Sequence, residues 1–142
     1  MTGPARVTIN CDGAARGNPG PAGAGAIVVD EEGAVLAEVA EGLGETTNNV
    51  AEYTAVIRGL EEAKRLGAHE VLLRSDSQLL INQLTGRYRV KAPHLQPLHR
   101  RVRALLVGFA KVDLEHVPRE RNAEADRLAN LGVDRWLADG RP

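Results

Sequence analysis

Hydrophobic and polar positions alternate along the first third of the chain. Alternation over residues 7–12, followed by apolar runs at 25–30 and 35–42, predicts three strands. The second and third strands are joined by a short loop that contains residues 31–33, so they must run antiparallel. Gly33 suits the positive φ that such a tight hairpin loop requires.

The remainder of the chain predicts helices separated by single strands. A helix is expected over 49–66, with Gly67 as its stop signal. Its buried stripe consists of apolar residues at helical spacing: Val50, Tyr53, Ile57, Leu60 and Ala63. The later elements are a strand at 71–75, a helix at 77–84, an irregular segment at 87–94, a helix at 95–110, a strand at 111–117 and a helix to about 136, capped by Asn122. The order βββαβααβα predicts one α/β domain over residues 1–142, a mixed sheet with helices packed on it and a frayed tail from about 138.

Composition narrows the class of protein. With 142 residues, 43% of them apolar and 26% charged, the chain is typical of one globular domain. It shows neither a membrane-spanning run nor the apolar core of a signal peptide, so we expect a cytoplasmic protein. The single cysteine, Cys11, excludes an internal disulfide and a cysteine-ligated zinc site. A net charge of −1 argues against binding nucleic acid through bulk charge, although basic residues are concentrated over 87–103.

Four carboxylates stand in distinctive local contexts. Asp12 ends the first predicted strand and opens the Gly-rich turn 13–20, whereas Asp76 ends the fourth strand. Glu52 lies in the first turn of a predicted helix, and Asp126 lies on the last one. If the fold brings them together, they form an all-oxygen cage suited to Mg²⁺ or Mn²⁺. This arrangement indicates phosphoryl chemistry.

Each of these acids also has an ordinary structural explanation. Asp12 could begin an Asx-type turn, and Asp76 could cap the helix that starts at residue 77. Asn49 and Glu52 have the spacing of a capping box, and Asp126 could be a solvated helix charge. Taken singly, each explanation is as good as metal binding.

Several motifs together resemble type 1 ribonuclease H. They are Asp12-Gly13, the Gly-Asn-Pro-Gly turn at 17–20, Thr47-Asn48-Asn49 before Glu52, Asp76-Ser77-Gln78, and Asn122 with Asp126. The resemblance covers nearly the whole chain, in order and with suitable spacing. It implies a five-stranded mixed sheet in the order 3-2-1-4-5. It also implies that two Mg²⁺ or Mn²⁺ ions support hydrolysis of the RNA strand of RNA–DNA hybrids, leaving 5′-phosphate and 3′-hydroxyl ends.

The resemblance carries the family's four catalytic, metal-binding acids onto Asp12, Glu52, Asp76 and Asp126, with Gly13 beside the metals. Better-known members have a longer loop before the fourth acid, with a histidine thought to help the product leave. Here that loop is only residues 118–121, so we expect Arg119 to act there and assign no such role to His116, which precedes the loop.

Substrate contacts are expected from small and amide-bearing residues. An RNA strand displays its 2′-hydroxyls in a wide, shallow minor groove, which backbone groups and amides can reach. Candidates on the RNA side and at base edges are Ala14, Ala15, Asn18, Asn48, Asn49 and Gln78. Candidates for DNA-strand phosphates are Thr47, Arg87 and Lys91. The lysine- and tryptophan-rich insertion that serves some bacterial members as a substrate handle is absent, so the basic stretch 87–103 is its only substitute.

Two other functions stay open at this point. One is another metal-dependent nuclease on the same fold, such as a junction resolvase or integrase-like core, although the Thr-Asn-Asn and Asp-Ser-Gln contexts favour hybrid recognition. The other is a nucleic-acid-binding module with an inactive site, although all four carboxylates are present. Some members of the family are fused to a phosphatase-like domain, so the chain could be one domain of a longer protein. We expect a monomer, because no large apolar face is left unassigned.

Overall fold

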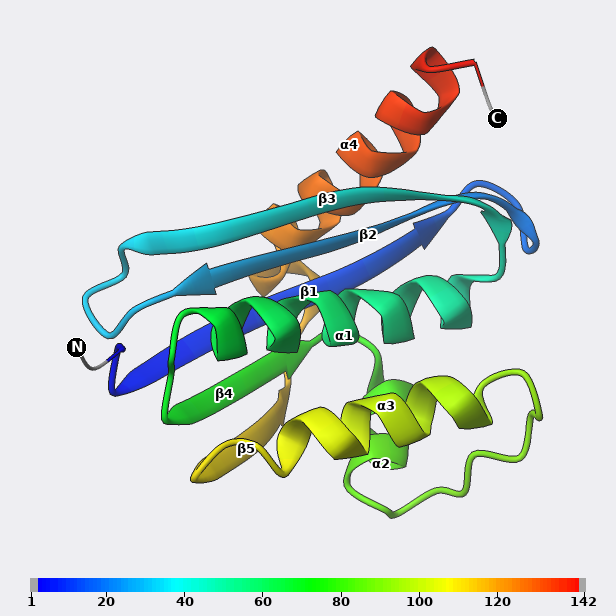
Figure 1. Cartoon of the computed structure of the whole chain (residues 1–142). Helices are drawn as coiled ribbons and strands as arrows, with labels where there is room; N and C mark the ends of the chain where they lie inside the picture. Colours follow the sequence, from blue (N-terminus) through cyan, green and yellow to red (C-terminus); the bar gives the residue numbers. More distant parts are fainter. Residues whose placement is uncertain (1–2, 141–142) are drawn as a thin grey trace.

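The computed structural model describes residues 3–140 and contains one five-stranded sheet with helices on both faces (Figure 1). The strands are β1 (Arg6–Ala15), β2 (Gly20–Val29), β3 (Val35–Thr46), β4 (Glu70–Ser75) and β5 (Lys111–His116). Their order in the sheet is β3-β2-β1-β4-β5. β1 and β3 run antiparallel to β2, whereas β4 runs parallel to β1 and β5 parallel to β4. The predicted α/β class, mixed sheet and strand order are therefore confirmed.

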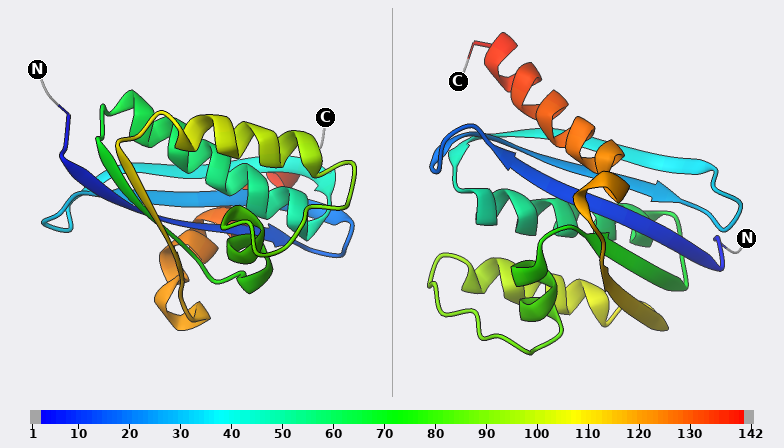
Figure 2. Two further views of the ribbon diagram at one scale, coloured as in Figure 1. Left: turned by 90° about the horizontal axis from the view of Figure 1, so that it is seen from below. Right: turned by 180° about the vertical axis from the view of Figure 1, so that it is seen from behind.

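The helices are α1 (Asn48–Arg65), α2 (Gln78–Leu84), α3 (Gln96–Leu106) and α4 (Ala123–Ala138), with a 3₁₀ turn at Arg119–Arg121. Helices α1 and α3 lie on one face of the sheet and α4 on the other (Figure 2). Tyr53, Val56 and Leu60 of α1 are buried against the same sheet face as Ile9 and Leu73. No helix within residues 3–140 is both long and apolar enough to cross a membrane.

The hairpin between β1 and β2 is longer than the sequence predicts. We expected β1 to end at Asp12 and β2 to begin at Gly25, but these two residues are paired inside the hairpin. Ladder pairing continues to Ala15 opposite Ala22, and Gly20 already belongs to β2. The prediction was wrong because glycine, alanine and proline are poor strand formers, so the extension has no local signal.

Small residues in this hairpin let helices lie close to the sheet on both faces. A Cβ at Gly13 would collide with the backbone of α1 at Glu52, and a Cβ at Gly25 would collide with the backbone of α4 at Ala125. A Cβ at Gly23 would likewise collide with the backbone of α4 at Ala129. Glycine is therefore required here for close approach, and the approach brings Glu52 and Asp126 toward Asp12 from opposite sides of the sheet.

Other boundaries differ from the prediction by a few residues. β3 continues to Thr46, and Asp30 belongs to the hairpin loop, where its carboxylate accepts bonds from the backbone N–H groups of Glu32 and Ala34, each at 2.9 Å. Gly33 has the expected positive φ, 85°. Helix α3 ends at Leu106 instead of residue 110, and α4 continues to Ala138. Of the predicted frayed tail, residues 141 and 142 lie outside the described part of the chain.

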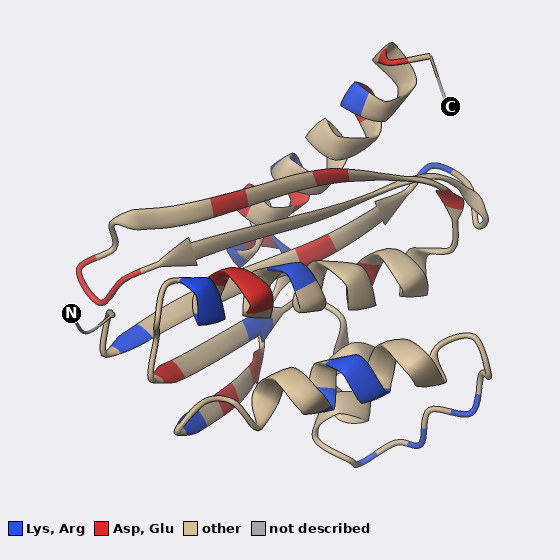
Figure 3. Cartoon of the chain, viewed as in Figure 1, with Lys and Arg blue, Asp and Glu red and all other residues tan. Residues whose placement is uncertain are grey.

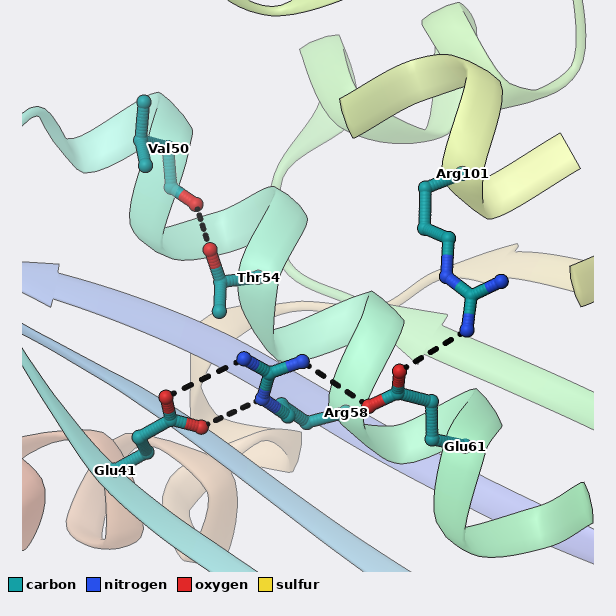
Figure 4. A network of polar contacts seen from close by, with 6 residues as sticks. All are labelled: Glu41, Val50, Thr54, Arg58, Glu61 and Arg101. Atoms are coloured by element: carbon teal, nitrogen blue, oxygen red, sulfur yellow. Dashed lines mark hydrogen bonds and ion pairs between the residues drawn. The ribbon is translucent and has the colours of Figure 1, made fainter. Parts of the chain in front are cut away.

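Ion pairs tie α1 to elements on either side of it (Figure 4). Arg58 of α1 donates to both carboxylate oxygens of Glu41 on β3, at 2.7 and 3.5 Å, and to Glu61 at 3.1 Å. Glu61 in turn accepts from Arg101 of α3 at 3.2 Å. These side chains are 35–52% exposed, so each pair contributes about 0–1 kcal/mol. The network also occupies Arg101, one of the basic residues in the stretch 87–103.

Candidate active site

Four acids from distant parts of the chain meet where β1 and β4 separate. Pairing between these strands ends at Asn10 and Arg74, just before Asp12 and Asp76. Carboxylate oxygens of Asp12, Glu52 and Asp76 lie within 4.8 Å of one another. Asp126, in the first turn of α4, is outside this group of three, but it lines the same cleft as Asp12 and helps raise the pKa of Asp12. The structure therefore brings together all four acids singled out in the sequence.

Helix capping does not explain Glu52 or Asp76. The side chain of Thr47 caps α1 by accepting from the backbone N–H of Val50 at 3.2 Å, and Glu52 lies one turn further along the helix. The side chain of Ser77 caps α2 by accepting from the backbone N–H of Leu80 at 3.1 Å. The capping-box and Asp76-cap explanations are therefore wrong.

The carboxylates disfavour one another's ionisation. Burial raises the pKa of Asp12 to about 8, with further contributions from the charges of Asp76 and Asp126, a hydrogen bond with Asp126 and the charge of Glu52. Burial likewise raises the pKa of Glu52 to about 7, as does the charge of Asp76, although hydrogen bonds from Ser77 and Asn48 oppose the shift. This cluster of carboxylates is stable in its ionised form only when a cation neutralises it. The atoms that it offers as metal ligands are all oxygens. Both properties fit Mg²⁺ or Mn²⁺.

Asn122 links β1, which carries Asp12, to the start of α4, which carries Asp126. Its side chain, only 1% exposed, donates to the backbone carbonyl of Cys11 at 3.0 Å and accepts from the Asn10 side chain at 3.1 Å. Asn122 is the N-cap residue of α4, as expected, although its side chain makes no capping hydrogen bond. Instead, the amide ties β1, one residue before Asp12, to α4, one turn before Asp126.

A cleft surrounds the acids and contains most of the predicted site residues. Besides the four acids, its lining consists of Gly13, Ala14, Ala15, Arg16, Asn48, Arg119 and Asn130. Asn18 stands at the rim, where its side-chain oxygen accepts from the backbone N–H of Asn48 at 3.1 Å. Asn49 follows Asn48 in the first turn of α1, and Gln78 is exposed at the start of α2.

Arg87 and Lys91 lie apart from this cleft, in the loop between α2 and α3. Lys91 lines a second cleft, whose wall also holds Tyr88, Arg89, Arg100 and Arg103. The structure therefore places Arg87 and Lys91 away from the acids, whereas Thr47, the N-cap residue of α1, directly precedes Asn48 of the acid cleft.

Two residues that line the acid cleft, Arg16 and Asn130, were missed by sequence reasoning. His116, to which no role was assigned, ends β5, and its ring nitrogen Nε2 lies 3.2 Å from the backbone oxygen of Asp76. A signal for Asn130 did exist, because it follows Asp126 by four residues and shares its helix face. Arg16 likewise continues the alternation that begins with Asp12 and Ala14.

Comparison with known sequences identifies relatives over most of the chain. Residues 10–132 match the sequence model of a family described as reverse transcriptase-like. Ribonuclease HI of Halobacterium salinarum is 46% identical over 129 residues, 91% of this chain and 65% of that protein. The bifunctional protein Rv2228c of Mycobacterium tuberculosis is 48% identical over 130 residues, and the chain spans only 36% of its length. A ribonuclease H of Pseudomonas syringae is 38% identical and is covered over 92% of its length.

Solved structures agree with these relationships. The RNase H1 of Halobacterium salinarum superposes with a TM-score of 0.88 at 45% identity, covering 92% of this chain and 98% of that one. The N-terminal RNase H domain of Rv2228c gives a TM-score of 0.86 at 48% identity, covering 88% and 96%. LC11-RNase H1, solved in complex with an RNA/DNA hybrid, gives 0.87 at 43% identity, covering 92% and 99%. With the motifs, the fold and the acid cluster all in agreement, the chain belongs to the type 1 ribonuclease H family of nucleases.

Proposed function

We propose that this chain hydrolyses the RNA strand of RNA–DNA hybrids with the help of two divalent cations, leaving 5′-phosphate and 3′-hydroxyl ends. The observation that carries the proposal is the convergence of Asp12, Glu52 and Asp76 within 4.8 Å, with Asp126 beside Asp12. A relative of 43% identity, LC11-RNase H1, has been solved in complex with a hybrid, which supports the choice of substrate.

The four acids act together in this proposal. Asp12 interacts with the other three acids, so Asp12, Glu52, Asp76 and Asp126 would hold the cations together, with Asp12 at the centre of the group. The backbone N–H of Gly13 donates to the Asp12 carboxylate at 3.0 Å and holds one of its oxygens in place. Bound Mg²⁺ or Mn²⁺ would activate water, stabilise the leaving oxygen and neutralise charge on the reacting phosphate.

Recognition of the RNA strand follows from the small residues beside the acids. Ala14 and Ala15 leave the backbone of β1 accessible along the cleft, where a shallow minor groove with its 2′-hydroxyls can approach. Asn18 fixes the start of α1 through the backbone of Asn48, which keeps the side chain of Asn48 in the cleft. Asn49 and Gln78 are proposed to add amide contacts.

The DNA strand is proposed to bind along the α2–α3 loop and α3, where Figure 3 shows several Lys and Arg positions along the ribbon. In this region Arg101 pairs with Glu61. Five other basic side chains there make no ion pair within residues 3–140, namely Arg87, Arg89, Lys91, Arg100 and Arg103. Cations without acidic partners are free to contact phosphates, and such contacts are independent of sequence. Thr47 accepts a capping bond through its oxygen, which leaves its hydroxyl hydrogen available to a phosphate.

Cleavage of a 5′-labelled RNA strand in an RNA–DNA hybrid tests the proposal directly. Reactions would contain Mg²⁺, Mn²⁺ or EDTA, with single-stranded RNA, duplex DNA and a four-way junction as parallel substrates. We expect metal-dependent cutting of the RNA strand in the hybrid alone. Cutting of the junction instead would indicate a resolvase, and binding without cutting under either metal would indicate a binding module.

Arg119 is proposed to contact the reacting phosphate and assist product release. It is exposed, lines the acid cleft and makes no ion pair within residues 3–140. We expect Arg119→Ala to lower kcat by about 10- to 100-fold, the effect of losing a hydrogen bond to a charged group. Binding of Mn²⁺ should be unaffected, because no carboxylate is altered.

Arg121→Ala is the matched control, since Arg121 belongs to the same 3₁₀ turn but does not line the acid cleft. It should leave turnover unchanged. Equal turnover in Arg119→Ala and wild-type protein would remove the proposed role of Arg119.

A further inference from the structure

Two polar side chains in the acid cleft have no part in the proposal so far. Arg16, just after β1, places its Nη2 atom 2.8 Å from Oδ1 of Asp134 and 3.3 Å from Oδ1 of Asn130. Asn130, on α4, directs its Nδ2 atom at Asp126, 3.0 Å from the backbone oxygen and 3.4 Å from the carboxylate oxygen Oδ1. The contacts form one continuous chain of polar groups, Asp134–Arg16–Asn130–Asp126.

The order of these contacts determines which end of the Asn130 amide faces Asp126. An amide can present either its oxygen or its NH₂ group, but a guanidinium has only donors. Arg16 can therefore bind only the Asn130 oxygen, which directs the NH₂ group to Asp126. The ion pair with Asp134 holds the Arg16 guanidinium next to the Asn130 side-chain oxygen. Without Arg16, the amide would lose one of the contacts that set its orientation, and only the Asp126 oxygens that accept from its NH₂ group would remain.

Asp126 is the acid that most needs such support. It lies outside the group of three acids and comes from the far face of the sheet. The glycines of β2 fix the backbone of α4, but they do not fix rotation of the Asp126 side chain. An N–H donor aimed at its carboxylate restricts that rotation.

We infer that Arg16 and Asn130 are positioning residues that hold the Asp126 carboxylate toward Asp12, in the orientation required to bind a divalent cation. Asn130 acts on Asp126 directly, and Arg16 acts only through Asn130. The inference rests on the proposed function for its kinetic consequences, whereas its consequence for metal binding does not depend on cleavage.

The test compares Asn130→Ala, Arg16→Ala, Arg16→Lys and the Arg16→Ala/Asn130→Ala double variant with wild-type protein. Arg127→Ala is the matched control, because Arg127 also lies on α4 and pairs with Glu124 at 3.1 Å and Glu38 at 3.5 Å, but does not line the cleft. For each protein, kcat and KM are measured on the hybrid, and Mn²⁺ binding is measured by calorimetry without substrate. Thermal unfolding shows that each variant is folded, and Arg16→Ala, at an exposed position, provides the test if Asn130→Ala does not fold.

We expect Asn130→Ala to lower kcat and weaken Mn²⁺ binding by about 10-fold each, as is typical of losing a group that orients a metal ligand. KM should be unchanged. Arg16→Ala should shift both quantities in the same direction by less, Arg16→Lys should restore most of the loss, and the double variant should be no worse than Asn130→Ala. Arg127→Ala should match the wild type.

Other outcomes overturn the inference. If the effects of Arg16→Ala and Asn130→Ala multiply in the double variant, or if Arg16→Ala mainly raises KM, then Arg16 acts on the substrate itself. Wild-type kcat and Mn²⁺ binding in Asn130→Ala would remove the role of Asn130. If the wild-type protein does not cleave the hybrid, the proposed function fails, while the Mn²⁺ measurements still decide the inference.

Discussion

Replacing Asp12 with asparagine is expected to abolish cleavage of the hybrid while the protein still binds it. Asparagine has nearly the same shape, so the fold should be preserved, but the charge that two cations would share is lost. Asp12 is 9% exposed and interacts with all three other acids, so no neighbour can substitute for it. We expect kcat to fall by about 1,000-fold or more. This loss is well beyond the roughly 10- to 100-fold typical of replacing a residue that hydrogen-bonds to a metal ligand.

Gel-shift titration in the presence of Mg²⁺ would show whether the variant still binds the hybrid. The matched control is Asp113→Asn, which removes an exposed carboxylate on β5 that pairs with Arg6 at 3.6 Å, outside the cleft. It should cleave like the wild type. Cleavage retained by Asp12→Asn would contradict the assignment of the acid cluster as the catalytic centre.

The parts of the fold that could be predicted are those whose signal is local. Residues such as Tyr53, Ile57 and Leu60 recur at helical spacing and are buried in α1 as expected. The end of β1 and the start of β2 could not be predicted, since the small residues there favour a turn when taken alone. These small residues form strands because α1 and α4 pack against the two faces of the hairpin, and only glycine leaves room for such close packing. Long-range packing thus overrides local propensity where the site is built.

The candidate site shows the same division. The four acids were visible because each stands in a recognisable motif, but their supporting contacts join residues far apart in sequence. Asn122 and Cys11 are 111 residues apart, and Arg16 and Asn130 are 114 apart. Asn122 occupies the expected N-cap position of α4, but its amide bonds to β1 instead of to its own helix, which no local pattern indicates. The caps proposed for Glu52 and Asp76 failed for a local reason, because Thr47 and Ser77 are better placed to cap.

The acid cluster is also expected to make the metal-free protein less stable as pH rises. The pKa values of Asp12 and Glu52 are raised in the folded state to about 8 and about 7, whereas in the unfolded chain both lie near 4. The folded state therefore binds their protons more tightly. This contribution to stability is fully present below about pH 4, declines as pH rises, and is lost above about pH 8.

A divalent cation should reverse this dependence. Protons and metal ions compete for the same oxygens, so Mn²⁺ should bind more tightly, and stabilise the protein more, at pH 8.5 than at pH 6. The measurement is the Tm in EDTA and in Mn²⁺ at the two pH values. Each kcal/mol that Mn²⁺ adds to the free energy of unfolding should raise Tm by about 2–8 °C. Asp12→Asn should raise Tm in EDTA at pH 8.5, because it removes the repulsion, and should lose most of the response to Mn²⁺. A shift with Mn²⁺ that is equal at both pH values, or unchanged in Asp12→Asn, would show that the ion binds elsewhere.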